Sequence, residues 1–196
     1  MSISPGPVNI TTLSAGVNYG FRSSFPFVSG ATIGFIVLLI TIGLGISNLV
    51  DQFNVLYEIL RYAGAGFIGY TGYKIIISTP EIKSEDTKLP GFYHGFLMQW
   101  LNPKAWIACL SGVSAFNLRD SYYMLFIFVG IYFVICYFSL AAWALLGSKV
   151  QFFLKVRERI KLFNLSMGGS LIIVALYLLL AEHRSSLLSL SVELIP

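Results

Sequence analysis

The stretch Gly95–Phe116, GFLMQWLNPKAWIACLSGVSAF, decides how this chain folds. It is apolar and long enough to cross a hydrocarbon core about 30 Å thick, yet Asn102, Pro103 and Lys104 lie near its middle. Proline has no N–H to close a helical hydrogen bond and its ring crowds the carbonyl one turn back, so we expect the helix to kink or break at Pro103. Backbone groups freed at this depth cannot be left to lipid, so the break indicates burial against other helices or a water-lined cavity.

Lys104 places a charge beside this break. An ammonium group inside a membrane span is costly and usually faces a pathway or a partner, so one interpretation puts Lys104 on a substrate pathway. In another, the span is a proline-kinked helix whose lysine snorkels to the interface or is neutral. A third is structural, with Lys104 bonding the carbonyls that Pro103 frees.

The composition places the whole chain in a membrane. Of its 196 residues, 56% are hydrophobic and 11% are charged, with a mean hydropathy of +0.77, whereas soluble domains are about 25% charged. The formal net charge is +4, but the basic residues lie mainly in predicted loops as topology signals, which argues against nucleic-acid binding. We therefore predict an all-α integral membrane protein.

Cysteine and N-terminal patterns add no further chemistry. Cys109 and Cys136 fall inside apolar spans without metal-ligand spacing, so we expect packing roles and no metal, disulfide or cofactor. The N-terminus lacks the charged, apolar and cleavage regions of a signal peptide. No zinc-protease or serine-hydrolase motif and no paired intramembrane carboxylate is present, so we predict that the chain is not an enzyme.

Apolar runs predict five to six transmembrane helices. Beside the broken span 95–116, they cover residues 29–50, 59–77, 122–146 and 165–181, with a short half-helix from Pro5 to Val17. Small residues let membrane helices approach closely, so glycines should pack tightly at positions 30 and 34 and along 64, 66, 69 and 72.

The segments between these runs are predicted to be connections. We expect a polar turn over 51–58 and a tight turn at Arg119-Asp120, with both histidines, His94 and His183, in loops. Residues 148–164, rich in lysine and arginine, fit either an amphipathic helix on an anionic membrane surface or a basic loop with frayed helix ends.

Charge asymmetry predicts the orientation. If loops alternate between the two faces, most lysines and arginines fall on the face that holds residues 78–94 and 148–164. Cytoplasmic loops carry the excess of basic residues, so we expect these two loops in the cytoplasm and the C-terminus outside it.

Two proline breaks divide the chain into similar halves. Pro5-Gly6-Pro7 opens residues 1–77, Asn102-Pro103 interrupts residues 95–196, and the polar linker 78–94 joins the two. Interrupted spans at corresponding positions of two halves indicate a transport site between repeats. With three helices in each half, the repeats would be inverted, with the broken helices at their interface.

Four sequence blocks together resemble the lysine-exporter superfamily, in its homoserine/threonine-efflux branch. They are SPGPVN (4–9), GATIGF (30–35), AGAGFIGYTGYKII (63–76) and GFLMQWLNPKA (95–105). The resemblance implies an inner-membrane exporter of amino acids or similar metabolites, driven by the proton gradient and forming homo-oligomers. Its motifs point to seven pathway residues: Pro5, Gly6, Pro7, Asn9, Asn102, Pro103 and Lys104.

Three positions depart from this family pattern. The family's first helix extends well upstream of the proline motif, Val8 stands where an asparagine is usual, and Phe35 stands where an acidic residue is usual. No Asp or Glu lies deep in any predicted span, so the coupling ion stays open. The short start of the chain also leaves an alternative, a non-transporting membrane helper or inactive truncated family member.

For an exporter, we expect half-helix N-termini and Lys104 to bind a substrate carboxylate. The side-chain carbonyl oxygens of Asn9 and Asn102 would accept hydrogen bonds from the substrate ammonium group.

Overall fold

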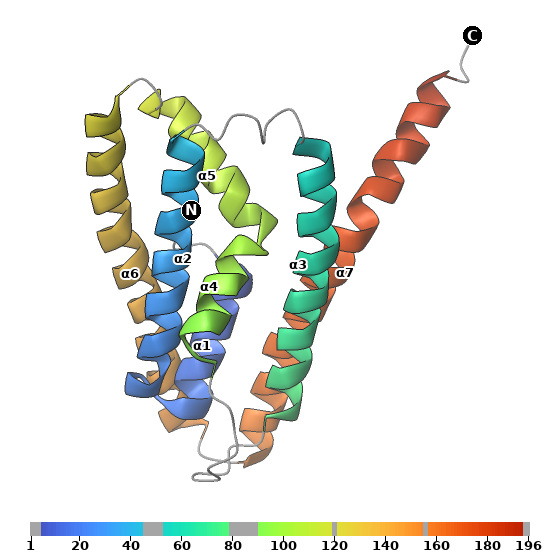
Figure 1. Cartoon of the computed structure of the whole chain (residues 1–196). Helices are drawn as coiled ribbons and strands as arrows, with labels where there is room; N and C mark the ends of the chain where they lie inside the picture. The colour runs from blue at the N-terminus through green and yellow to red at the C-terminus, as the bar shows by residue number, and fades with distance from the viewer. Residues whose placement is uncertain (1–4, 45–52, 79–89, 119–120, 155–156, 194–196) are drawn as a thin grey trace.

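The computed structural model describes residues 5–44, 53–78, 90–118, 121–154 and 157–193, and all secondary structure in these ranges is helical. Figure 1 shows a bundle of roughly aligned helices. The helices are α1 (Pro7–Tyr19), a 3-10 turn η1 (Arg22–Ser24), α2 (Phe25–Gly43), α3 (Phe53–Ile77), α4 (Phe92–Trp100), α5 (Pro103–Ala115), α6 (Tyr122–Phe153) and α7 (Arg157–Glu193).

Three of these segments are long and apolar enough to cross a membrane, namely Arg22–Gly43, Tyr122–Phe152 and Glu158–Leu180. The all-α membrane class predicted from composition is therefore confirmed. α3 has 25 residues, or about 37 Å at 1.5 Å per residue, which also matches a bilayer. The short helices α4 and α5 follow one another along the bundle, with α5 continuing upward from α4 (Figure 1).

Several predicted boundaries were wrong. α3 starts at Phe53, so the described part of the predicted turn 51–58 is helical. Residues 148–164 form neither a separate surface helix nor a loop over most of their length, because α6 runs to Phe153 and α7 resumes at Arg157. The predicted turn Arg119-Asp120 and linker residues 79–89 lie outside the described residues.

Both histidines were also misplaced in loops. α4 begins at Phe92 and so includes His94, and α7 continues through position 183. The first error matters for function, because His94 faces a cavity described below.

Glycine contacts hold the helices together in three pairs. A Cβ on Gly16 of α1 would overlap the Ala144 carbonyl of α6, and one on Gly30 of α2 would overlap the Phe92 carbonyl of α4. A Cβ on Gly72 of α3 would press against the Gly168 carbonyl of α7. Such close approach needs small residues. The predicted tight packing is confirmed at Gly30, Gly34, Gly64 and Gly72, but it is wrong for Gly66, where a Cβ would meet no described atom within 4 Å.

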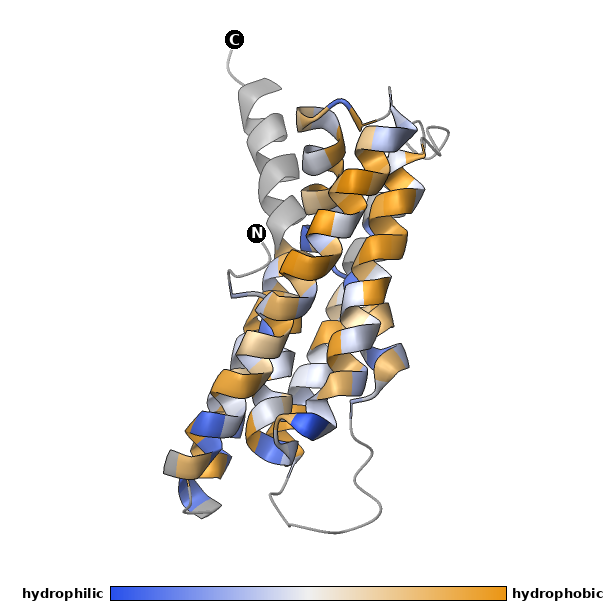
Figure 2. Ribbon diagram, turned by 90° about the vertical axis from the view of Figure 1, so that its left-hand side faces the viewer, coloured by the Kyte–Doolittle hydropathy of each residue, from blue (hydrophilic) through white to orange (hydrophobic). Residues whose placement is uncertain are grey.

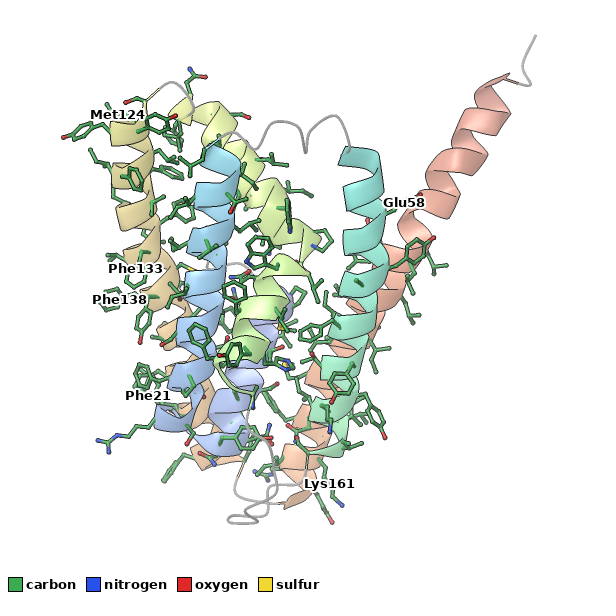
Figure 3. The ribbon with its side chains drawn as sticks, viewed as in Figure 1. Phe21, Glu58, Met124, Phe133, Phe138 and Lys161 are labelled. Carbon is green, nitrogen blue, oxygen red and sulfur yellow. The ribbon has the colours of Figure 1, made fainter. Side chains whose placement is uncertain are left out.

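The outside of the bundle suits lipid. α6 exposes a series of large apolar side chains, among them Phe126, Phe133 and Phe138, and Figure 3 shows the two labelled ones pointing away from the bundle. In Figure 2 strong blue, hydrophilic colour gathers at the lower end, where α6 ends and α7 begins. Exposed apolar surface of this extent in the middle of a bundle is typical of a lipid-facing belt.

Candidate functional site

The two proline motifs lie next to each other in space, although they are about half the chain apart. The Lys104 Nζ group donates a hydrogen bond to the Pro5 carbonyl oxygen at 3.1 Å. Gly6 leaves room for this contact, because a Cβ at position 6 would lie 3.1 Å from Lys104 Nζ. A larger residue at position 6 would therefore require the lysine side chain to shift.

The break between α4 and α5 is well satisfied without the lysine side chain. The Trp106 indole N–H donates to the Trp100 carbonyl at 2.8 Å, and the backbone N–H of Lys104 donates to Asn102 Oδ1 at 3.2 Å. Gly64 of α3 packs directly on the Leu101 carbonyl. The structural interpretation of Lys104, as the partner of carbonyls freed by Pro103, has no support in these contacts.

Two helix N-termini converge at this point. α1 and α5 each have proline in the first turn, and their N-cap residues, Gly6 and Asn102, are both extended. A helix N-terminus carries positive partial charge and unpaired N–H groups. Together with the Lys104 ammonium group, the two ends make a region that favours an anion such as a carboxylate.

A small cavity of about 50 Å³ occupies the junction. It lies between α1, α2, α4, α5 and α6, and we call it the central cavity. Its volume suits water, which takes about 30 Å³ per molecule, rather than an amino acid. The lining residues are Gly6, Val8, Asn9, Phe35, Gln99, Asn102, Lys104, Ala105, Ala108, Tyr132, Cys136 and Leu140.

Five of the seven predicted site residues lie at this junction. Gly6, Asn9, Asn102 and Lys104 line the cavity, while Pro5 contributes its carbonyl oxygen. Pro103 starts α5 and is buried. Pro7 is buried at the start of α1 and does not line the cavity.

Asn102 has a structural role in addition to the substrate contact expected of it. Its Oδ1 atom caps α5 by accepting from the Lys104 N–H and has a second lone pair for a further hydrogen bond. The Nδ2 group remains as a donor beside the cavity, which suits a carboxylate better than an ammonium group.

Sequence reasoning missed several lining residues. Gln99 is 6% exposed and is a polar side chain in an otherwise apolar turn of α4, a signal that could have marked it. Phe35, where the family usually has an acid, stacks on Tyr132 of α6 with ring centroids 5.5 Å apart. An aromatic pair thus fills the place of that acid.

A second, larger cavity of about 580 Å³ lies between α1, α3 and α4, and we call it the side cavity. Ser78, directly after α3, and Pro90, shortly before α4, both line it, so it lies toward the lower end of Figure 1. The other lining residues are Thr11, Ser14, Ala15, Asn18, Tyr19, Tyr70, Thr71, Lys74, Ile75, Ile77 and His94. This cavity has room for a small metabolite.

An amide network joins three helices at the same end of the bundle. Asn164 of α7 is fully buried and exchanges two hydrogen bonds, of 2.8 and 2.9 Å, with Asn18 of α1. Its Nδ2 group also donates to the Ser78 carbonyl and hydroxyl oxygens at 3.0 Å. The network ties α7 to both walls of the side cavity.

Comparisons with known proteins agree on one family. The family model described as LysE type translocator matches residues 1–182. A cysteine/O-acetylserine efflux protein of Escherichia coli O1:K1 is 30% identical over 155 residues, which cover 76% of this chain and 78% of that protein. A protein of the same description from Salmonella typhimurium is 29% identical over 154 residues, with the same coverage. No solved structure matches the chain.

Proposed function

This chain belongs to the family of LysE type translocators, and on that premise we propose that it exports small neutral amino acids or their derivatives across the bacterial inner membrane. As a family member it is an integral membrane transporter and not an enzyme.

The convergence of two helix N-termini on Lys104 is the observation that carries this proposal. In this proposal the substrate carboxylate binds between Lys104, the Asn102 Nδ2 group and the N-terminus of α1, with the positive end of the α5 dipole beside it. The Pro5 carbonyl, which now accepts from Lys104 Nζ at 3.1 Å, would accept from the substrate ammonium group once the carboxylate has drawn the lysine away. Both proline motifs thus contribute a contact to the substrate in this proposal.

The charges of the lining residues support neutral substrates. Among the residues that the structure describes, neither cavity is lined by an aspartate or glutamate, whereas each is lined by one lysine. A basic side chain on the substrate would meet no compensating carboxylate there and would be repelled by the ammonium groups. The relatives named as cysteine/O-acetylserine efflux proteins fit this substrate class.

The pairing of the helices supports two inverted repeats, residues 1–77 and 95–196. The span that contains α1 packs on α6, the span made of α4 and α5 packs on α2, and α3 packs on α7. In each half, the first span therefore packs on the second span of the other half, and the two third spans pack on each other. Exchanging the two halves gives the same set of pairs. In addition, α1 and α5 each have 13 residues and follow a proline break.

For the orientation, we propose that the lower end in Figure 1 is cytoplasmic. Arg22, Lys149, Arg159 and Lys161 gather at this end, which Figure 3 marks with Lys161, while Glu58 lies in the upper part. The side cavity also lies toward the lower end, so substrate would enter it from the cytoplasm and move past α1 and α4 to the central cavity. The latter must widen, because 50 Å³ cannot hold an amino acid.

Efflux assays test the proposal directly. Inverted vesicles that contain the chain should take up labelled O-acetylserine, cysteine or serine faster than vesicles without it, and should discriminate against lysine. Equal uptake by both vesicle preparations for the whole panel would contradict export and favour a non-transporting helper. Light scattering of the purified protein tests the oligomer that the family resemblance implies.

A further inference from the structure

His94 is placed where a proton-carrying group would be useful. It lies in the first turn of α4 and lines the side cavity. Among the side chains that the structure describes, the only carboxylates are Glu58 and Glu158, and both are exposed. An intramembrane carboxylate to carry protons is therefore absent from the described spans, and Phe35 and Tyr132 fill the usual place of one.

Hydrogen bonding fixes how the imidazole can be protonated. The Thr71 hydroxyl donates its only hydrogen to the Phe67 carbonyl at 2.8 Å. Thr71 Oγ1 also lies 3.1 Å from His94 Nε2, so it can only accept there, and Nε2 must carry a hydrogen. The neutral ring consequently keeps its lone pair on Nδ1, for which the described residues offer no hydrogen-bond partner.

Two aromatic rings lie beside the imidazole of His94, which also faces the side cavity. The Phe67 ring lies 4.9 Å from the imidazole between centroids, and the Phe27 ring lies 6.0 Å away. Among the described residues, the other titratable groups that line this cavity are Tyr70 and Lys74 of α3 and Tyr19 of α1. α2 has no titratable side chain from Phe25 to Gly43, and Lys104 of α5 lines the central cavity instead.

We propose that His94 is the proton-carrying residue of this exporter, an inference that rests on the proposed function. Nδ1 takes up a proton when the pathway is open to the outside and releases it when the side cavity is open to the cytoplasm, while Nε2–H stays on Thr71. Histidine is suited to this task because its ordinary pKa falls within the physiological range. α4 also carries Gln99 to the central cavity, so one short helix links the proton site to the substrate site.

Substitution by glutamine separates proton coupling from transport, because the glutamine amide can still donate to Thr71 but cannot titrate. Reconstituted wild-type protein and His94→Gln are compared in two assays with the labelled amino acid that moves fastest in the efflux panel. Counterflow without a pH gradient should stay within about twofold of wild type, whereas accumulation driven by a pH gradient should fall at least tenfold. Tyr93→Phe, at a neighbouring position that is 81% exposed, should leave both unchanged.

Two results would overturn the inference. One is gradient-driven accumulation by folded His94→Gln at the wild-type level, and the other is the loss of counterflow together with accumulation. If instead the wild-type protein moves no labelled amino acid, the proposed function itself fails.

A second measurement needs neither transport nor the His94 variant. The sequence has two histidines, so His183→Gln leaves His94 as the only imidazole visible by nitrogen NMR. We expect it to titrate between about pH 5 and 8 and to carry its hydrogen on Nε2 at the alkaline end. An imidazole that keeps one charge state across this window would exclude a proton-carrying role.

Discussion

At the scale of single residues, Lys104 connects the two halves of the chain. The carbonyl that Lys104 contacts belongs to Pro5, while the carbonyls of its own break are covered by Trp106 and Gly64. The ammonium group thus bridges the two motifs. A substrate that displaces the ammonium group from Pro5 would break this hydrogen bond between the two motifs.

Pro103 is the residue whose replacement tests whether the break matters. In Pro103→Ala an N–H becomes available at position 103, and α4 and α5 can join into one continuous helix. We expect export to fall to background in vesicle assays while the amount of membrane-inserted protein stays at the wild-type level. Wild-type export by this variant would show that the break serves packing alone.

At the scale of helices, three glycine-mediated contacts define the bundle. α1 meets α6 at Gly16 and Gly147, where the Cα of Gly16 would lie 3.1 Å from a Cβ on Gly147. α1 must be held in this way because it is short and its N-terminus has to stay at the central cavity. Gly66 of α3 offers a contrast, since a Cβ there meets no described atom within 4 Å.

Leucine substitutions at these two glycines should differ sharply. Gly147→Leu forces α1 and α6 apart, and overpacking of this kind costs about 1–3 kcal/mol or more, so the melting temperature in detergent should drop. Gly66→Leu enters open space and replaces a poor helix former, so it should leave the melting temperature unchanged or raise it. Equal melting temperatures for the two variants would contradict the close α1–α6 contact.

Helix boundaries show how far sequence reasoning reaches. The interruption at Pro103 rests on proline's missing N–H, a local cause that is readable from the sequence alone. The helical start of α3 at Phe53 was missed because Asn54 and Glu58 look like turn residues, although polar residues are common where helices leave a bilayer. His94 was missed for the same reason, since the polar residues before it hid a helix that begins at Phe92.

The composition of the central cavity was beyond the sequence. Gln99, Tyr132 and Phe35 come from three different helices, and only their packing brings them together. The motif residues could be identified from the sequence, because proline, asparagine and lysine are unusual inside a membrane span whatever residues they contact.

At the scale of the whole molecule, the bundle has two chemically different ends. The lower end collects basic side chains and the side cavity, and the C-terminal end of α7 lies at the other end (Figure 1). If cytoplasmic loops carry the excess of lysine and arginine, this polarity sets the direction of export.

Cysteine labelling in intact cells tests that polarity. Starting from a variant with Cys109 and Cys136 replaced, a cysteine introduced after Ser185 should react with an impermeant maleimide. Single cysteines within 83–88 or 149–161 should react only after permeabilisation. A C-terminal cysteine that is labelled only in permeabilised cells would reverse the orientation proposed above.

We propose that Lys104 acts in transport rather than in folding, and the Lys104→Met variant separates these two roles. The substitution removes the cost of placing an ammonium group at mid-span, roughly 2.5–3.5 kcal/mol. It also loses a hydrogen bond to a charged group, which contributes about 1.5–3 kcal/mol. Melting temperature and efflux are measured on the same purified, reconstituted variant. We expect Lys104→Met to have an equal or higher melting temperature and an efflux rate reduced to background. A destabilised Lys104→Met protein that still exports at the wild-type rate would contradict a role of Lys104 in transport.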